Sequence, residues 1–227
     1  MVLSGVVAKR IQSLFPAVPL RQAALPVYGC YGRQIDREAL RKGLGLTKPT
    51  MLFFGYVREY KGLRYLLRAM PRILRSVDVE LLIVGEFYED RSGYDRLIAE
   101  LGIGEHVRIV AEHVPDEDVA RYFGAADVAV LPYVSATQSG ITQIAFAYGV
   151  PVISTNVGGL PEVVQDGVTG YIVEPRSEEA LASAVVRYFS EGKRDELSAN
   201  VRVEAKRDNA GELMRRAISD FLEMERG

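Results

Sequence analysis

Residues 53–73, FFGYVREYKGLRYLLRAMPRI, contain an apolar run, a glycine, a short basic turn and then an amphipathic helical pattern. This order is typical of a buried strand that leads through a tight loop into a helix. Two cations, Arg58 and Lys61, stand in the loop. A helix N-terminus already attracts anions, so cations added there favour a phosphate-binding loop. The alternative is a pair of solvated cations that is bridged to Glu59.

The same alternation of strand and helix continues downstream. Strands are expected at 50–56, 79–85, 106–112, 127–133, 150–156 and 170–174, and helices at 61–75, 93–101, 116–124, 139–148 and 178–190. The strands are continuous apolar runs, as expected when helices cover both faces of a sheet. The pattern predicts an α/β fold with a Rossmann-like, doubly wound parallel sheet. Ligands bind such sheets at the carboxyl ends of the strands, which directs attention to the loops there.

Three segments are expected. Residues 1–49 are predicted to be a linker with a short helix at 2–15 and a short strand within 16–32, and 50–192 to be the ligand-binding domain. The tail at 193–227 is expected to be helical, with Leu213, Ala217 and Phe221 spaced to dock on another surface. The first helix is expected to pack on a domain, and contact with a membrane surface is the alternative.

The composition excludes several classes of function. A net charge of -2 gives no broad basic field for nucleic acid. A single cysteine, Cys30, rules out an internal disulfide and is expected to be an apolar filler in a strand. With only two histidines, a histidine-rich metal site is not expected. Lys9 and Arg10 follow the first apolar residues instead of preceding them, so we expect no signal peptide and a cytoplasmic protein.

A second polar loop, at 132–141, leads from a strand into a helix of small residues. Ser135, Thr137, Gln138 and Ser139 supply hydrogen-bonding groups, and Gly140 lets a ligand approach the helix start closely. The alternative is that Ser139 or Thr137 caps the helix and no ligand binds. Two anion-friendly helix starts at strand ends favour one shared ligand.

Other motifs have structural explanations. Glu162, after a Gly-Gly turn, is expected either to bond loop N–H groups or to contact a ligand. Asp116–Asp118 has the D-x-D form of some metal-dependent transferases, but it follows Pro115 and opens a helix, so N-capping is favoured. No complete G-x-G-x-x-G is present, and we expect no metal and no nicotinamide or flavin cofactor.

Taken together, five segments resemble a known family. They are FGYVREYKGLRYLLRAM (54–70), LLIVGEF (81–87), HVRIVAEHVPDEDVARYFGAADVAVLPY (106–133), GVPVIST (149–155) and GGLPEVVQDGVTGYIVEP (158–175). In this order they resemble the C-terminal, donor-binding domain of GT-B glycosyltransferases, in particular the GT4 group of retaining enzymes (glycosyl transferases group 1). The chain would then be one half of a GT-B fold with helical extensions at both ends.

The resemblance implies a UDP-, GDP- or ADP-sugar as substrate and no separate cofactor. The acceptor would be held by an N-terminal domain or a separate subunit, and membrane contact would come only through that partner or the acceptor. The chain is then either a piece of a longer protein or a natural half, and alone it is expected to bind donor and transfer poorly.

The resemblance also implies roles for residues. Arg58 and Lys61 would neutralise the diphosphate and act in catalysis by stabilising the leaving nucleotide. Segments 85–88 and 112–115 would border the base. The expected donor-binding residues are Gly55, Gly85, Glu86, Val114, Tyr133, Thr137, Gln138, Ser139, Gly140, Ile141 and Glu162.

One departure concerns two glutamates that the family usually carries eight positions apart. Ala136 and Ile144 stand there in this chain, which weakens the expectation of ribose contacts and of a retaining outcome. A non-catalytic nucleotide-sugar-binding subunit or scaffold is therefore an alternative. A GT-B-fold epimerase is a third hypothesis, disfavoured because no suitable pair of carboxylates is expected in the loops that face the cleft.

Overall fold

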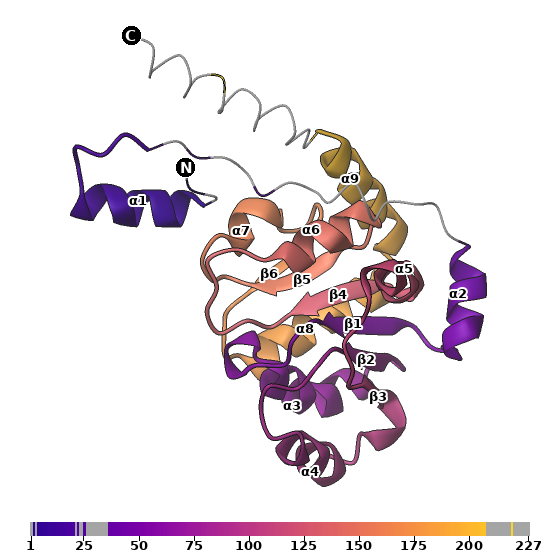
Figure 1. The fold of residues 1–227 in the computed structure, drawn as a ribbon. Helices are drawn as coiled ribbons and strands as arrows, with labels where there is room; N and C mark the ends of the chain where they lie inside the picture. The colour runs from indigo at the N-terminus through magenta and orange to yellow at the C-terminus, as the bar shows by residue number, and fades with distance from the viewer. Residues whose placement is uncertain are drawn as a thin grey trace.

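The computed structural model describes residues 2, 4–20, 22, 25, 36–207 and 219 of the chain. Cys30 and the docking positions Leu213, Ala217 and Phe221 lie outside the described residues, as does most of the strand expected within 16–32. Two helices precede the sheet, α1 (Gly5–Leu14) and α2 (Arg37–Leu44). Figure 1 shows α1 standing apart from the sheet, on the side of α7.

The centre of the molecule is a six-stranded parallel sheet in the order β3-β2-β1-β4-β5-β6 (Figure 1). The strands are β1 (Thr50–Phe54), β2 (Glu80–Val84), β3 (Val107–Val110), β4 (Val128–Leu131), β5 (Val152–Thr155) and β6 (Gly170–Val173). The predicted Rossmann-like α/β fold is confirmed, with each strand shorter than its expected span. The strand order reverses between β1 and β4, and the crevice at such a switch point is where ligands bind in open α/β sheets.

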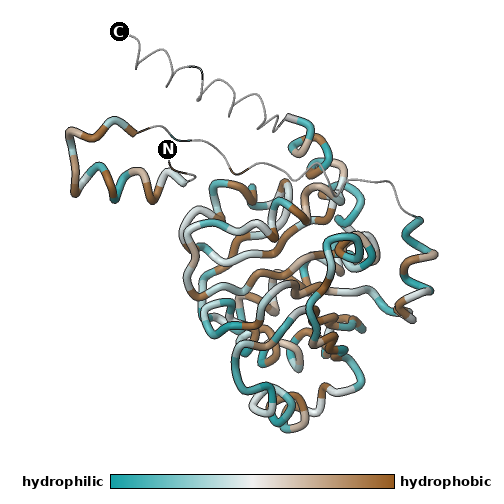
Figure 2. Tube along the Cα trace, in the orientation of Figure 1, coloured by the Kyte–Doolittle hydropathy of each residue, from teal (hydrophilic) through white to brown (hydrophobic). Residues whose placement is uncertain are grey.

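Helices cover both faces of this sheet. They are α3 (Leu63–Leu74), α4 (Ser92–Glu100), α5 (Asp116–Ala125), α6 (Gly140–Ala147), α7 (Leu160–Val163), α8 (Glu178–Ser190) and α9 (Arg194–Arg207), with short 3-10 turns at η1 (Glu59–Lys61) and η2 (Gly104–His106). Alternate residues of β1 enter opposite cores: Met51 and Phe53 join α3 and α8, and Leu52 joins α5 and α6. Figure 2 shows the hydrophobic residues concentrated in the strands and on the inner sides of the helices.

The turn after β1 differs from the helix start expected at residue 61. Lys61 ends the 3-10 turn η1, and Gly62 has a φ of 70° before α3 begins at Leu63. A β-carbon at Gly62 would lie 1.9 Å from the carbonyl oxygen of Pro132, so only glycine fits. The loops after β1 and β4 therefore touch, which brings Lys61 next to the polar loop.

The acids at 116–118 also sit differently from their expected N-cap. Pro115 holds the N-cap position, and Asp116, Glu117 and Asp118 occupy the first turn of α5. Negative charge in the first turn interacts favourably with the helix dipole. The helix start thus explains the acidic run, but the acids lie in the first turn of α5 and do not occupy the N-cap position.

Candidate functional site

Two adjoining cavities open at the carboxyl ends of β1, β2 and β4. The loop cavity, about 700 Å³, is lined by Tyr60, Lys61, Tyr133, Ser135, Ala136, Thr137, Gln138, Ser139, Gly140, Ile141 and Ile144. The sheet cavity, about 220 Å³, is lined by Phe54, Gly55, Tyr56, Lys61, Gly85, Glu86, Glu112, His113, Val114, Asp116, Val119, Ile141 and Ile144. Lys61, Ile141 and Ile144 line both, so they form the boundary that an elongated ligand would cross.

Lys61 is a buried cation at this boundary. The residue is only 7% exposed, and its ammonium group forms no ion pair with any residue that the structure describes. Nζ lies 5.7 Å from the centre of the Tyr133 ring, and a β-carbon on Gly55 would come within 2.8 Å of it. Burial, and to a smaller extent the charge of Arg58, lower the pKa of Lys61 to about 8. A buried charge without a partner is costly, so this ammonium group is a cation of the site that is free to pair with an anion.

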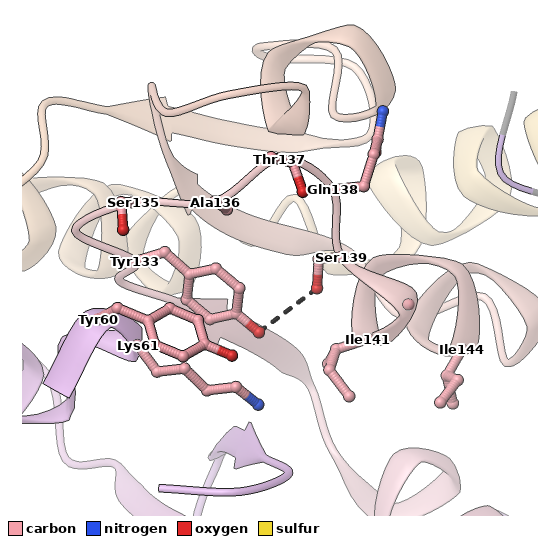
Figure 3. Close-up of a pocket in the computed structure, with 11 residues that line it drawn as sticks. Tyr60, Lys61, Tyr133, Ser135, Ala136, Thr137, Gln138, Ser139, Ile141 and Ile144 are labelled. Carbon is pink, nitrogen blue, oxygen red and sulfur yellow. Dashed lines mark hydrogen bonds between the residues drawn. The ribbon is translucent and has the colours of Figure 1, made fainter. Parts of the chain in front are cut away.

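The polar loop places hydrogen-bonding groups opposite Lys61 (Figure 3). Ser139 occupies the N-cap position of α6, but its side chain makes no capping hydrogen bond. Its Oγ instead lies 3.4 Å from the hydroxyl of Tyr133, whose pKa is raised by burial. The alternative that Ser139 only caps the helix is therefore not what the structure shows. The first N–H groups of α6 remain available at the edge of the loop cavity.

Arg58 lies outside both cavities. Its side chain is exposed, and its guanidinium carbon sits 4.5 Å from the centre of the Tyr88 ring. Tyr88 meets Tyr56 edge-on, with 4.8 Å between ring centroids. Backbone hydrogen bonds join the two loops, from the N–H of Val57 to the oxygen of Glu86 at 2.8 Å and from Tyr88 N–H to the oxygen of Val57 at 3.1 Å. Arg58 thus stands at the rim, near enough for its charge to affect the pKa of Lys61.

Glu162 has a structural role in this arrangement. Its carboxylate accepts hydrogen bonds from the hydroxyl of Ser4 at 3.3 Å, from Gly5 N–H at 3.0 Å and from Val6 N–H at 3.1 Å. It therefore caps the N-terminus of α1 and lines neither cavity. Bonding to N–H groups was one of its expected roles, but the partners are in the first helix and not in its own loop.

The structure brings most of the expected residues together. The sheet cavity receives Gly55, Gly85, Glu86 and Val114, the loop cavity receives Tyr133, Thr137, Gln138, Ser139 and Gly140, and Lys61 and Ile141 line both. Arg58 and Glu162 line neither. Sequence reasoning missed Tyr60, whose only signal was its place beside Lys61. It also missed Asp116, which lines the sheet cavity together with Glu86 and Glu112. That no suitable acid–base pair of carboxylates faces the cleft stays a prediction.

No group of three or more His, Cys, Asp or Glu side chains placed to hold a metal ion occurs among residues 4–20 and 36–207 or the other described positions. Within the same described part of the chain, none of the helices has the length and apolar character needed to cross a bilayer.

A doubly wound parallel sheet with cavities at its switch point defines a class of α/β domain that binds ligands at the carboxyl ends of its strands. The family model of glycosyl transferases group 1 matches residues 48–191, and the chain belongs to this family. A D-inositol 3-phosphate glycosyltransferase of Streptomyces griseus is 36% identical over 165 residues, which are 67% of this chain and 34% of that protein. The chain spans 34–44% of the length of the curated relatives it matches first.

Solved structures of GT-B glycosyltransferases share the fold. Sucrose-phosphate synthase from Thermosynechococcus elongatus gives a TM-score of 0.81 at 25% identity, covering 96% of this chain and 58% of that one. Anabaena HepE in complex with UDP-glucose gives a TM-score of 0.78 at 17% identity, covering 90% of this chain and 57% of that one. The chain therefore matches 57–58% of the length of these two proteins.

Proposed function

We propose that this chain is the donor-binding domain of a glycosyltransferase and holds a nucleotide-diphosphate sugar across the two cavities, with the diphosphate at Lys61. The observation that carries the proposal is the buried, unpaired ammonium group at the boundary of both cavities. The mostly apolar walls of the sheet cavity suit a nucleobase, and the hydroxyl groups of the loop cavity suit a sugar. The UDP-glucose complex of HepE supports this class of ligand.

The residues suggest how this domain would assist transfer. When the glycosidic bond breaks, negative charge grows on the leaving diphosphate. Lys61 and the N–H groups at the start of α6 would stabilise that charge in a partly water-excluded site, where their effect is larger than in water. These fixed positive groups would make transfer independent of a metal ion. Arg58 would add a guanidinium at the rim, with its fork suited to phosphate oxygens.

Binding of the acceptor requires a second domain or subunit in this proposal. Since the chain spans less than half of its curated relatives, we infer that an N-terminal domain or separate subunit holds the acceptor and completes the cleft. Three points stay predictions: a donor that carries UDP, GDP or ADP, the GT4 assignment and a cytoplasmic location.

A non-catalytic subunit is the second candidate. One observation favours it: none of the described residues that line the loop cavity is an acid, and Ala136 and Ile144 present apolar side chains there. Such a subunit would bind the same donor, so binding alone does not separate the two. Adding the N-terminal half separates them, because a glycosyltransferase then transfers sugar and a scaffold does not.

The direct test is calorimetric titration of the chain with UDP-, GDP- and ADP-sugars, alongside Lys61→Met. We expect one nucleotide class to bind the unmodified chain and to bind the variant at least tenfold more weakly. Lys48→Met is a matched control, because Lys48 is partly exposed and pairs with Asp78 at 2.8 Å. If no donor binds at millimolar concentration, the proposal is wrong.

A further inference from the structure

A third cavity lies at the amino ends of the strands, whereas the two cavities described above lie at the carboxyl ends. It has a volume of about 680 Å³ and is formed by the start of α2, the residues before β4 and β5, and one side of α9. We name it the rear groove. Its charged residues are Arg37, Asp127, Arg194, Arg202 and Lys206. Figure 1 shows α9 lying beside α6 at this end of the molecule.

The single carboxylate of the rear groove is already engaged within the fold. Asp127 is 7% exposed, and its oxygens meet Arg37 at 2.5 Å, Arg194 at 3.0 Å and Arg41 at 3.3 Å. It also accepts a hydrogen bond from the N–H of Thr50 at 2.8 Å. A carboxylate so occupied has no capacity left to neutralise further cations of the groove.

Two cations of the groove have no ion-pair partner in the described part of the chain. Arg202 and Lys206 form no ion pair with any described residue. The Nε of Arg37 is buried and has no hydrogen-bond acceptor in the described part of the chain. Burial lowers the pKa of Arg37, and the charges of Arg194 and Arg41 add to this effect against the opposing effect of Asp127. The chain as a whole carries a net charge of -2, so this concentration of cations is local.

The geometry concentrates these cations on one line. Arg194, Ser198, Arg202 and Lys206 follow each other at intervals of four, so they share one face of α9, and that face lines the groove. Like charges at this spacing repel each other. A β-carbon on Gly149 would lie 2.7 Å from Nε of Arg202, so the absence of a side chain there lets the guanidinium lie against the end of α6.

We propose that the rear groove is a second ligand site, separate from the donor site, that binds the phosphate group of a phosphorylated molecule. Guanidinium forks match phosphate oxygens, and an ammonium group adds a compact charge. The volume is within the range of sites for small ligands. Phosphate of this kind occurs on free phosphorylated compounds and on the headgroups of anionic phospholipids, and the test separates these two sources.

The test uses inorganic pyrophosphate as the probe, titrated calorimetrically into the whole chain carrying Lys61→Met, which weakens the donor site. We expect saturable binding that falls at least tenfold in the variant that also carries Arg202→Gln and Lys206→Gln. The matched control carries Arg75→Gln and Lys42→Gln, which remove the same charge from two exposed positions elsewhere. The control should change the affinity less than twofold.

Vesicles distinguish the sources of phosphate. Co-sedimentation with phosphatidylcholine vesicles that contain phosphatidic acid, compared with phosphatidylcholine alone, indicates a headgroup ligand if binding depends on Arg202 and Lys206. Binding of pyrophosphate without vesicle binding indicates a free compound. An equal loss in both double variants, or no binding of either probe, would overturn the proposal. Thermal unfolding shows whether each variant is folded, and Arg202→Gln alone gives a second, milder variant.

Donor binding is measured separately, on the chain with Lys61 intact, so the rear groove and the donor site can fail independently. A chain that binds no nucleotide sugar but retains Arg202-dependent pyrophosphate binding would contradict the proposed function only.

Discussion

Buried charges are compensated differently at the two ends of the strands, which we call the amino edge and the carboxyl edge of the sheet. At the amino edge, the carboxylate of Asp127 is surrounded by three arginines and a backbone N–H, all supplied by the fold. At the carboxyl edge, the ammonium group of Lys61 is equally buried and has no carboxylate partner among the described residues. Removing one partner of a buried ion pair destabilises the fold, because the other charge is left uncompensated, whereas a buried charge without a partner in a cleft is a candidate ligand contact.

The largest expected effect is on Asp127. Asp127→Asn removes the charge that three arginines share, and we expect the free energy of unfolding to fall by about 3 kcal/mol, the lower end for a broken buried pair because the arginines are partly exposed. Urea unfolding measures this. Asp78→Asn, at an exposed ion pair, should cost under about 0.5 kcal/mol. A loss as small as that in Asp127→Asn would mean that the network does not stabilise the fold.

Lys61→Met tests the opposite edge. We expect donor affinity to fall by about 1.5–3 kcal/mol, because a charge-assisted contact to the diphosphate is lost. The free energy of unfolding should stay the same or rise, since an uncompensated buried charge is removed. Calorimetry and urea unfolding measure the two quantities on the same variant. A large loss of stability with unchanged donor affinity would reverse the comparison.

The lowered pKa of Lys61 predicts a pH dependence with a definite sign. Between pH 8 and the ordinary lysine pKa of 10.5, the unfolded chain binds more protons than the folded one, so stability should rise with pH in that window. Donor affinity should fall in the same direction, by about tenfold from pH 7 to pH 9, because the diphosphate binds the protonated amine. Calorimetry across this range measures it. Lys61→Arg should flatten the profile, since arginine stays charged.

Tyr88 is expected to have the smallest effect. Its ring supports the guanidinium of Arg58, and such exposed contacts contribute about 0.5–1 kcal/mol. Tyr88→Leu should therefore weaken donor binding two- to fivefold, while Tyr88→Phe keeps the ring and should change little. In a chain that already carries Arg58→Ala, the leucine variant should have no further effect. If Tyr88→Leu tightened binding instead, the ring would be holding Arg58 away from the ligand.

How far the sequence predicted the molecule depends on the sequence separation of the interactions. The sheet followed from local apolar runs, and the loops of the site followed from the rule that ligands bind at strand ends. The position of Arg58 did not follow, because it is set by Tyr88 from the next loop. The roles of Glu162 and Asp127 did not follow either: their partners in α1 and α2 stand between 86 and 158 positions away.

Helix α6 links the two edges. It begins at Gly140 beside the loop cavity and ends at Ala147 beside the rear groove, a length of about 12 Å for eight residues. Because α6 is short, a shift of its first turn would also move its last turn. Thermodynamic linkage then requires the coupling to be reciprocal. If a ligand in the rear groove changed the affinity of the loop cavity for its ligand by some factor, a ligand in the loop cavity would change the affinity of the rear groove by the same factor.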